Sequence, residues 1–224
     1  MERMDGVRAY VFDAYGTLLD VHGAMRRHAA LLPPDWERIS AEWRAKQLEY
    51  TWVLSLTGPR HHRDFWQLTQ AALDWVCARH GITDPAVRGV LLDAYRALPA
   101  YPEVIPTLRA LRDRGCRTAV FSNGEPAMLD AALRAAGLDG LLDAVVSVES
   151  AGVFKPDPRT YALVTQSLGL APAEMAFVSS NAWDAQGAVA AGFRVAWCNR
   201  ASLPDEYGLR AAATVIPDLA ALAA

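Results

Sequence analysis

Short apolar runs alternate with helical patterns along most of this chain, and this alternation narrows the folds available to it. Each run is almost continuously apolar, as expected for strands that helices cover on both faces. The predicted strands are residues 8–12, 117–121, 144–147, 175–179, 194–197 and 214–216. Helical patterns lie between them, for example at residues 104–114, 127–136 and 159–168. Strands separated by helices need crossover connections, so the sequence predicts an α/β fold with a parallel sheet.

One long interval interrupts this alternation. Between Leu18 and about Leu98 the sequence has helical pattern but no good strand. Roughly eighty residues is too long for a plain loop, so we expect a helical insertion. Open α/β sheets bind ligands at the carboxyl ends of their strands, and the insertion is expected to cover that edge. The predicted division is a core domain of residues 1–18 and 99–224 and a helical cap domain of residues 19–98.

The composition supports one buried core and argues against several classes of function. Hydrophobic residues make up 52% of the 224 residues, enough for a core and a smaller insertion. A net charge of −3 argues against a nucleic-acid surface but is compatible with a small anionic substrate. The sequence predicts neither a signal peptide nor a membrane span. Cys77, Cys116 and Cys198 are widely spaced and indicate buried thiols in a reducing compartment, so we expect a cytoplasmic protein.

Four polar clusters are expected at one edge of the sheet. Asp13 comes directly after the first strand, and the other clusters are residues 122–124 (Ser-Asn-Gly), 155–156 (Lys-Pro) and 179–184 (Ser-Ser-Asn-Ala-Trp-Asp). A single Asp in this position often only closes a tight turn. A carboxylate, an ammonium group and several hydrogen-bonding groups together indicate an active site in which Asp13 is the nucleophile. All five histidines lie outside these clusters, which argues against Ser-His-Asp chemistry.

These motifs, in this order, resemble those of the haloacid dehalogenase superfamily, and in detail those of the (S)-2-haloacid dehalogenases. The matching segments are residues 12–18 (Phe-Asp-Ala-Tyr-Gly-Thr-Leu), 43–52, 121–124, 154–158 with Tyr161, and 177–184. The resemblance implies a doubly wound, Rossmann-like sheet with a helical cap inserted after the first strand. It also implies a homodimer without a cofactor, acting on a small halogenated carboxylic acid.

Two positions separate this sequence from the magnesium-dependent phosphatases of the same superfamily. Those enzymes place a second Asp two residues after the nucleophile as a general acid, where this chain has Tyr15. They also use an acidic pair after the fourth strand to help hold Mg²⁺, where this chain has Ser180 and retains only Asp184. A halide leaves as an anion and needs no proton, so both departures favour attack on carbon without a metal.

The reaction implied by the resemblance is metal-independent hydrolysis of (S)-2-haloalkanoic acids to (R)-2-hydroxyalkanoic acids through a covalent ester of Asp13. Three alternatives stay open: a fluoroacetate-type defluorinase that uses the same site, a magnesium-dependent phosphatase, and a catalytically silent binding module on the same scaffold. The complete set of polar site residues argues against the last, because unneeded buried charges are costly to retain.

Arg44 is the candidate for stabilising the departing halide. On a helix it shares one face with Leu48, Trp52 and Ser55, so it belongs to the apolar stripe. An Arg that snorkels over the core to a surface carboxylate would have the same spacing. The spacing leaves both interpretations open, and the resemblance favours the halide and substrate role.

The residues beside Arg44 lead to two further expectations. Glu42 and Lys46 lie off the apolar stripe and are spaced to pair with each other. Ala45 stands where relatives often have Gln, and this difference is expected to alter the polarity of the pocket.

Lys155 is expected near Asp13 and Asp184, where its ammonium group would favour ionised carboxylates. As an isolated Lys-Pro pair it would more often be a surface lysine. Ser122 and Asn123 can donate to a substrate carboxylate or cap the following helix. Residues 181–184 (Asn-Ala-Trp-Asp) likewise fit a helix cap.

The resemblance supplies the remaining roles. Thr17 would hold the Asp13 carboxylate, while Ser179, Asn181 and Asp184 would position Lys155 and the hydrolytic water. The expected substrate-binding residues are Ala14, Tyr15, Arg44, Leu48, Phe65, Ser122, Asn123, Tyr161 and Trp183. Four of them would form an apolar wall around the alkyl group of the substrate, although ordinary core packing explains them equally well: Tyr15, Leu48, Phe65 and Trp183.

Overall fold

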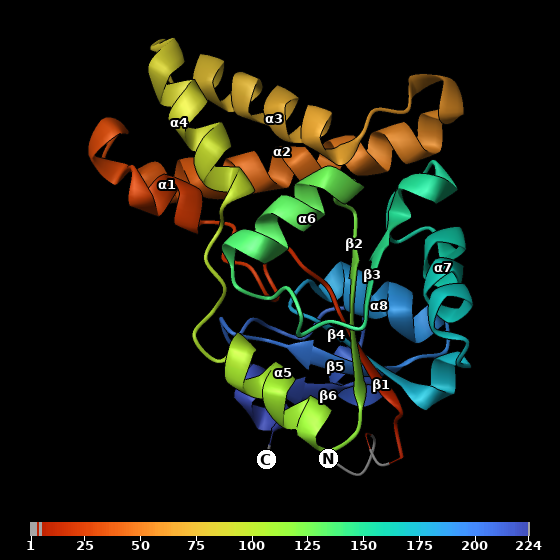
Figure 1. Cartoon of the computed structure of the whole chain (residues 1–224). Coiled ribbons are helices and arrows are strands. Elements are labelled where there is room, and N and C mark those ends of the chain that lie inside the picture. Colours follow the sequence, from red (N-terminus) through yellow and green to blue (C-terminus); the bar gives the residue numbers. More distant parts are fainter. Residues whose placement is uncertain (1–3, 5, 224) are drawn as a thin grey trace.

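The computed structural model describes residue 4 and residues 6–223, and its centre is a sheet of six parallel strands in the order β3-β2-β1-β4-β5-β6 (Figure 1). The strands are β1 (Ala9–Phe12), β2 (Arg117–Ser122), β3 (Ala144–Ser147), β4 (Met175–Ser179), β5 (Arg194–Cys198) and β6 (Thr214–Ile216). Successive strands run outward from β1 on one side and from β4 on the other, which is a doubly wound sheet. All six predicted strands are present, and their bounds differ from the prediction by one residue at most.

Helices connect the strands and cover both sides of the sheet. α5 packs against β2 on one side, and α7 and α8 pack beside each other on the other side (Figure 1). Asp157 caps the start of α7, Pro158 occupies its first turn, and Gly169 ends it with φ 62°. The connecting helices are α5 (Val104–Asp113), α6 (Pro126–Ala135), η4 (Val148–Ala151), α7 (Pro158–Leu168), η5 (Pro172–Glu174), α8 (Ala182–Ala190), α9 (Leu209–Ala212) and η6 (Leu219–Leu222).

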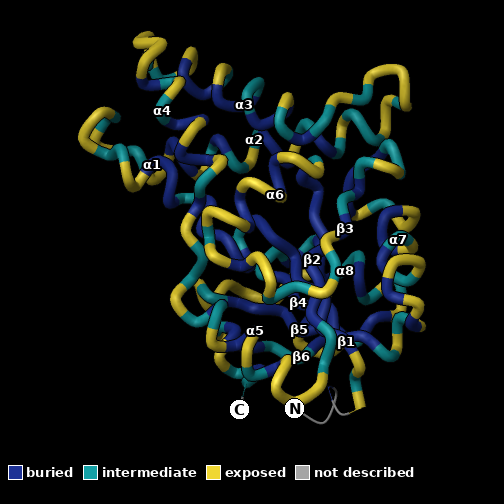
Figure 2. The backbone as a smooth tube through the Cα atoms, viewed as in Figure 1, coloured by how far each residue is buried: buried dark blue, intermediate teal, exposed yellow. Residues whose placement is uncertain are grey.

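The central strands are buried along their whole length, as their continuous apolar runs predict. Every residue of β1 and of β4 is buried, and the interior of the sheet is dark blue in Figure 2. The edge strand β3 is more open, and its Val145 is 50% exposed. A residue that directly follows β1 or β4 is therefore attached to the most deeply buried strands of the sheet.

The interval between β1 and α5 is helical, as predicted. Its helices are α1 (Gly23–Arg27), η2 (Ala29–Leu31), α2 (Trp36–Thr57), η3 (Pro59–His61), α3 (Phe65–Arg79) and α4 (Pro85–Arg96). They lie together at one end of the sheet (Figure 1). Leu19 pairs with Ala100, and the N–H of Asp20 donates to the carbonyl of Pro99 at 2.9 Å. The chain thus enters and leaves this helical region through two adjacent segments.

Two expectations about individual side chains are wrong. Lys46 pairs with Glu49 and lies over the ring of Trp75, whereas Glu42 accepts from His80 at the end of α3. Glu49 lies one turn along α2 from Lys46, and the packing of α3 on α2 brings Trp75 to Lys46 and His80 to Glu42. Cys116 is half-buried rather than buried.

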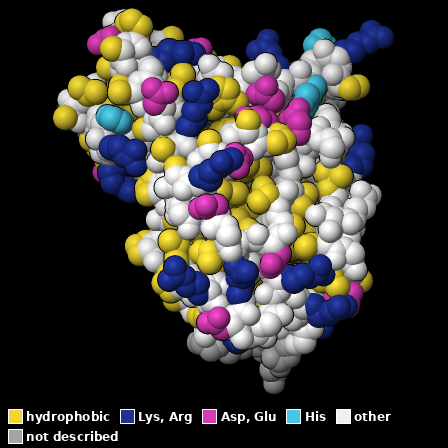
Figure 3. Space-filling view, in the orientation of Figure 1, with side chains coloured by type: hydrophobic (Ala, Val, Ile, Leu, Met, Phe, Trp, Pro, Cys, Tyr) yellow, Lys and Arg dark blue, Asp and Glu magenta, His cyan; other side chains and the backbone are white. Residues whose placement is uncertain are grey.

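The surface carries charges of both signs. Basic and acidic side chains are interspersed on the face shown in Figure 3. Among the described residues, no helix combines the length and apolar character needed to cross a bilayer.

Candidate active site

Asp13 follows β1 at the point where the sheet reverses its winding. Its N–H donates to the carbonyl of Val178 in β4 at 2.9 Å, which keeps it between the two central strands. Ligands of doubly wound sheets bind in the crevice at this point. Asp13 is 5% exposed, so its carboxylate needs donors or a cation nearby.

Oδ2 of Asp13 accepts hydrogen bonds from three side chains. Thr17 Oγ1 donates at 3.0 Å, Asn181 Nδ2 at 2.8 Å and Ser179 Oγ at 3.5 Å. Thr17 reaches back because Gly16 turns the chain with φ 92°, a backbone conformation that glycine adopts without strain. These donors fix the orientation of the carboxylate.

Ser179 and Asn181 both contact Asp13, and their expected role in positioning Lys155 and the hydrolytic water stays a prediction. Of the three residues expected to position Lys155, Asp184 is the one that contacts its ammonium group. Asn181 begins α8 without a side-chain capping bond, since its amide is directed at Asp13. The capping interpretation of residues 181–184 is therefore wrong.

Lys155 lies at the centre of the buried charges. Its Nζ donates to Asp13 Oδ1 at 3.1 Å, to Asp184 Oδ2 at 2.9 Å and to the carbonyl of Phe121 at 2.7 Å. The ammonium group also lies 4.3 Å from the centre of the Phe121 ring. Lys155 is 1% exposed, so the alternative of a surface lysine is wrong. Bonds to both carboxylates let one cation compensate two buried anions in part.

Asp184 is held between Lys155 and Tyr161. The hydroxyl of Tyr161 donates to Asp184 Oδ1 at 2.7 Å. Burial raises the pKa of Asp184 to about 6, and Asp13 adds to this rise while Lys155 and Tyr161 oppose it. Burial also raises the pKa of Tyr161 well above 10, with Asp184 contributing, so this phenol keeps its proton and remains a donor.

Ser122 ends β2 and Asn123 follows it, and the side chains of both accept from backbone N–H groups. Ser122 Oγ accepts from the N–H of Gly124 at 3.0 Å, and Asn123 Oδ1 accepts from the N–H of Lys155 at 2.9 Å. Glu125, and not Ser122 or Asn123, caps α6 by accepting from two backbone N–H groups of its first turn. The capping alternative for these two residues is wrong, and their contact with a substrate carboxylate stays a prediction.

Arg44 extends from α2 toward the loop that carries Asp13. Its Nη1 donates to Gln47 Oε1 at 2.7 Å and its Nη2 to the carbonyl of Tyr15 at 3.1 Å. Asn181 Nδ2 donates to the same carbonyl at 3.2 Å, which connects the arginine to the Asp13 site. These partners are neutral, so the alternative of an arginine paired with a surface carboxylate is wrong.

The predicted apolar stripe of α2 faces the sheet domain. Leu48 is buried, Trp52 packs edge-on against Trp183 with ring centres 5.7 Å apart, and Ser55 Oγ accepts from the N–H of Phe154 at 3.0 Å. Ala45 is exposed. The structure therefore gives no support to the expectation that Ala45 sets the polarity of the site.

Aromatic rings gather around Tyr15. Its ring centre lies 5.6 Å from that of Phe65 and 5.8 Å from that of Tyr95. Burial raises the pKa of Tyr15 well above 10, and its hydroxyl has no hydrogen-bond partner among the described residues. Ala14 beside it is fully buried, and its carbonyl accepts from the N–H groups of the turn that follows.

Two residues that contribute to this site were not predicted. Gln47 bonds Arg44, and its only sequence signal is the i+3 spacing on a helix. Gly187 in α8 makes room for Tyr161, because a Cβ at this position would lie 2.2 Å from the phenol oxygen. A glycine inside a helix is a weak signal in the sequence, since it does not say which neighbour requires the space.

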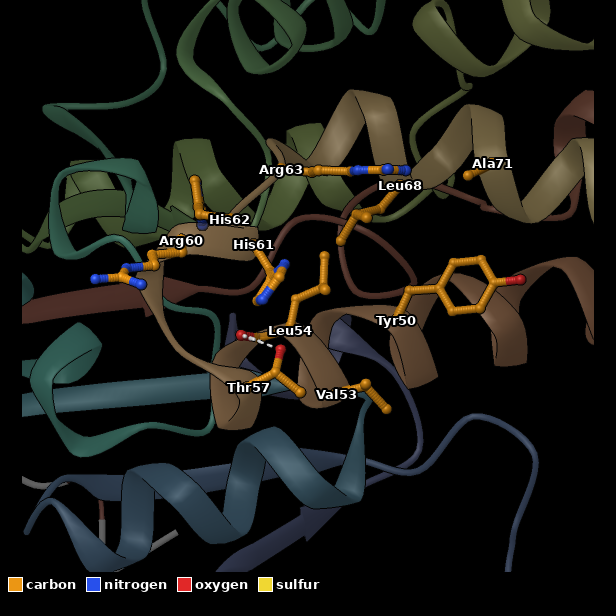
Figure 4. Close-up of a pocket in the computed structure, with 10 residues that line it drawn as sticks. All are labelled: Tyr50, Val53, Leu54, Thr57, Arg60, His61, His62, Arg63, Leu68 and Ala71. Atoms are coloured by element: carbon orange, nitrogen blue, oxygen red, sulfur yellow. Dashed lines mark hydrogen bonds between the residues drawn. The ribbon is translucent and has the colours of Figure 1, made fainter.

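A separate hollow of about 670 Å³ lies between α2 and α3 (Figure 4). Its walls include Tyr50, Leu54, Arg60, His61 and Leu68, and none of the predicted site residues lines it. Among the described residues, no group of three or more His, Cys, Asp or Glu side chains is arranged to hold a metal ion.

The fold and the site together define a doubly wound α/β protein in which a buried lysine bridges two buried aspartates at the carboxyl edge of the sheet. Residues 7–192 match the model of the haloacid dehalogenase-like hydrolases. The chain is 47% identical to (S)-2-haloacid dehalogenase 1 of Pseudomonas sp. (strain CBS-3), over 91% of this chain and 89% of that protein.

Two solved structures extend the comparison. A crystal structure of a dehalogenase has a TM-score of 0.94 at 42% identity, covering 97% of this chain and 96% of the other. An L-2-haloacid dehalogenase from Xanthobacter autotrophicus with chloropropionic acid covalently bound has a TM-score of 0.87 at 37% identity, covering 97% of each chain. The chain belongs to the haloacid dehalogenase-like hydrolases and, within them, to the (S)-2-haloacid dehalogenases.

Proposed function

We propose that this enzyme hydrolyses (S)-2-haloalkanoic acids to (R)-2-hydroxyalkanoic acids through a covalent ester of Asp13. The observation that carries the proposal is the Lys155 ammonium group bonded to the carboxylates of both Asp13 and Asp184. The carboxylate is the nucleophile, and the ammonium group is the cation that accompanies it in this buried site. The relative from Xanthobacter autotrophicus, which holds chloropropionic acid covalently, supports an ester intermediate.

The first step forms the ester. Among the described residues, Asp13 Oδ1 accepts one bond, from Lys155, whereas Oδ2 accepts three, so Oδ1 has the freer lone pair. This oxygen attacks C2 of the substrate from the side opposite the halogen. The new C–O bond forms as the carbon–halogen bond breaks, the configuration at C2 inverts, and the halide leaves with the electron pair.

The second step hydrolyses the ester. Water attacks the carbonyl carbon of Asp13, and the negative charge that develops on Oδ2 is met by Thr17 and Asn181. The bond between this carbon and Oδ1 then breaks, and Oδ1 leaves as the hydroxyl oxygen of the hydroxy acid. One proton of the water goes to this hydroxyl and the other to solvent, and the carboxylate is restored with one oxygen from water.

Metal independence is part of the proposal and rests on the chemistry of the donors. Mg²⁺ prefers several oxygen ligands that include carboxylates. Here Lys155 already bridges the two carboxylates, and Ser180 stands where the phosphatases have an acid.

We also propose that residues 19–98 act as a cap domain over this site, with Arg44 and the rings of Tyr15 and Phe65 shaping the space for the substrate. Homodimers and a cytoplasmic location complete the proposal, and sedimentation velocity tests the former.

Halide release is the direct test of the proposed function. The wild-type protein is expected to release halide from (S)-2-chloropropionate and not from the (R) enantiomer, with unchanged rates in EDTA. Asp13→Asn should abolish release, and single turnover in H₂¹⁸O should label Asp13 before the product. Full activity of Asp13→Asn, or label that appears first in the hydroxy acid, contradicts the ester mechanism. Chelator-sensitive turnover of aryl phosphates would identify a phosphatase, and release from fluoroacetate would identify a defluorinase.

A further inference from the structure

Gln47 carries a buried amide beside Arg44. It is 1% exposed and lies where α2, α3 and α4 meet. A buried amide is costly unless its donor and acceptor sides are both bonded. The partners of Gln47 therefore show what this side chain does in the fold.

The bonds of Thr69 determine which way this amide points. Thr69 Oγ1 donates its one proton to the carbonyl of Phe65 at 2.7 Å, so toward Gln47 it can only accept. Gln47 must then present its Nε2 to Thr69, at 2.6 Å. Its Oε1 consequently faces the other way and accepts from Arg44 Nη1 at 2.7 Å and from the Tyr95 hydroxyl at 3.1 Å.

We propose that Gln47 is a positioning residue that fixes the guanidinium group of Arg44 for the leaving halide and the substrate carboxylate. The proposal rests on the proposed function. Gln47 and the carbonyl of Tyr15 hold one N–H on each terminal nitrogen of Arg44. A guanidinium group has five N–H donors in a rigid plane, so two fixed bonds set the direction of the others.

The neutrality of the amide is part of this role. A carboxylate in place of Gln47 would form an ion pair with Arg44 and offset the charge that an arriving or departing anion needs. The amide orients the guanidinium group and leaves its charge in place. Preorganised positive charge of this kind stabilises anions that develop in a transition state.

The experiment measures kinetics and fold in matched variants. Gln47→Leu should lower kcat/KM about tenfold to a hundredfold, mainly through kcat, because a bond to a charged group is lost. Gln47→Glu keeps the acceptor for Arg44 but loses the donor to Thr69, so its unfolding midpoint should fall less than that of Gln47→Leu while kcat falls by a similar factor. Gln67→Leu is the matched control, since Gln67 is exposed on α3, and it should change kcat less than twofold.

Dependence on Arg44 separates positioning from a general structural effect. With Arg44→Ala in the background, adding Gln47→Leu should cost less than twofold in kcat/KM, because the two residues act as one unit. An equal loss in both backgrounds, or wild-type kcat in Gln47→Glu, overturns the proposal.

A binding readout keeps this test separate from the proposed function. Bromide should raise the unfolding midpoint of the wild-type protein more than that of Gln47→Leu, Arg44→Ala or the double variant. The proposed function fails if the wild-type protein releases no halide, and the bromide comparison still tests the coupling. Equal bromide shifts in wild type and Gln47→Leu, or a wild-type shift that does not depend on Arg44, overturn the positioning role.

Discussion

Replacing Lys155 with Met should destabilise the protein by an amount that grows with pH. The substitution keeps most of the side-chain volume and removes the three bonds of Nζ. Removing one partner of a buried ion pair costs about 3–5 kcal/mol when the remaining charge stays uncompensated. In this variant Asp13 and Asp184 lose the cation that they share, and taking up a proton is the way left to reduce their buried negative charge.

The sign of the pH dependence follows from the pKa of Asp184. Burial raises this pKa to about 6 while Lys155 lowers it, so the variant must have a pKa above 6. Above pH 6 the folded variant keeps a proton that the folded wild-type protein and both unfolded chains have lost. The variant then loses up to about 1.4 kcal/mol of unfolding free energy per pH unit, and the wild-type protein does not.

Urea unfolding at several values between about pH 5 and pH 8 measures the difference. The free energy of unfolding of Lys155→Met should lie slightly below that of the wild-type protein near pH 5, and this difference should grow by about 1–3 kcal/mol toward pH 8. Lys46→Met is the control, because Lys46 pairs with Glu49 near the surface, and its effect should stay within about 0.5 kcal/mol at every pH. A difference in unfolding free energy between Lys155→Met and the wild-type protein that stays constant with pH would refute the reasoning.

Two further predictions concern Tyr161 and Asp184. Gly187→Ala should push Tyr161 off Asp184, lower the free energy of unfolding by about 1–3 kcal/mol and reduce halide release. Gly89→Ala is the control, because a Cβ there meets open space, and it should leave the rate of halide release unchanged. Equal effects of the two variants on urea unfolding and on the rate would contradict this. If ionised Asp184 is needed to hold Lys155, kcat/KM should fall about tenfold per unit below about pH 6, and Asp184→Asn should lose this acidic limb; an unchanged limb in that variant would assign it to another group.

The strands were predictable because their environment is uniform. β1 and β4 have helices on both faces, so each position in them is buried and apolar, and the sequence shows the run directly. The meeting of Asp13 and Lys155 was predictable for a related reason. The carboxyl ends of parallel strands share one edge, whatever the loops between them do.

The bonds within the site were less predictable, because several partners compete for each polar group. The sequence allows Asn181 to cap α8, but its amide bonds Asp13, and Glu125 caps α6 although Ser122 and Asn123 lie nearby. The role of Gln47 depends on α3 and α4, which supply its other partners. Tertiary packing selects among local options that are similar in energy.

Tyr15 and Lys155 together limit what the proposed nucleophile can displace. Burial raises the pKa of Tyr15 well above 10, so its proton does not transfer to a leaving group near neutral pH. Lys155 donates one N–H each to Asp13, Asp184 and the carbonyl of Phe121, and giving up a proton would leave two buried carboxylates without a cation. A group that Asp13 displaces from C2 must therefore depart as a stable anion. Halides meet this condition and alkoxides do not, so Tyr15 and Lys155 together favour a carbon–halogen bond as the target of Asp13.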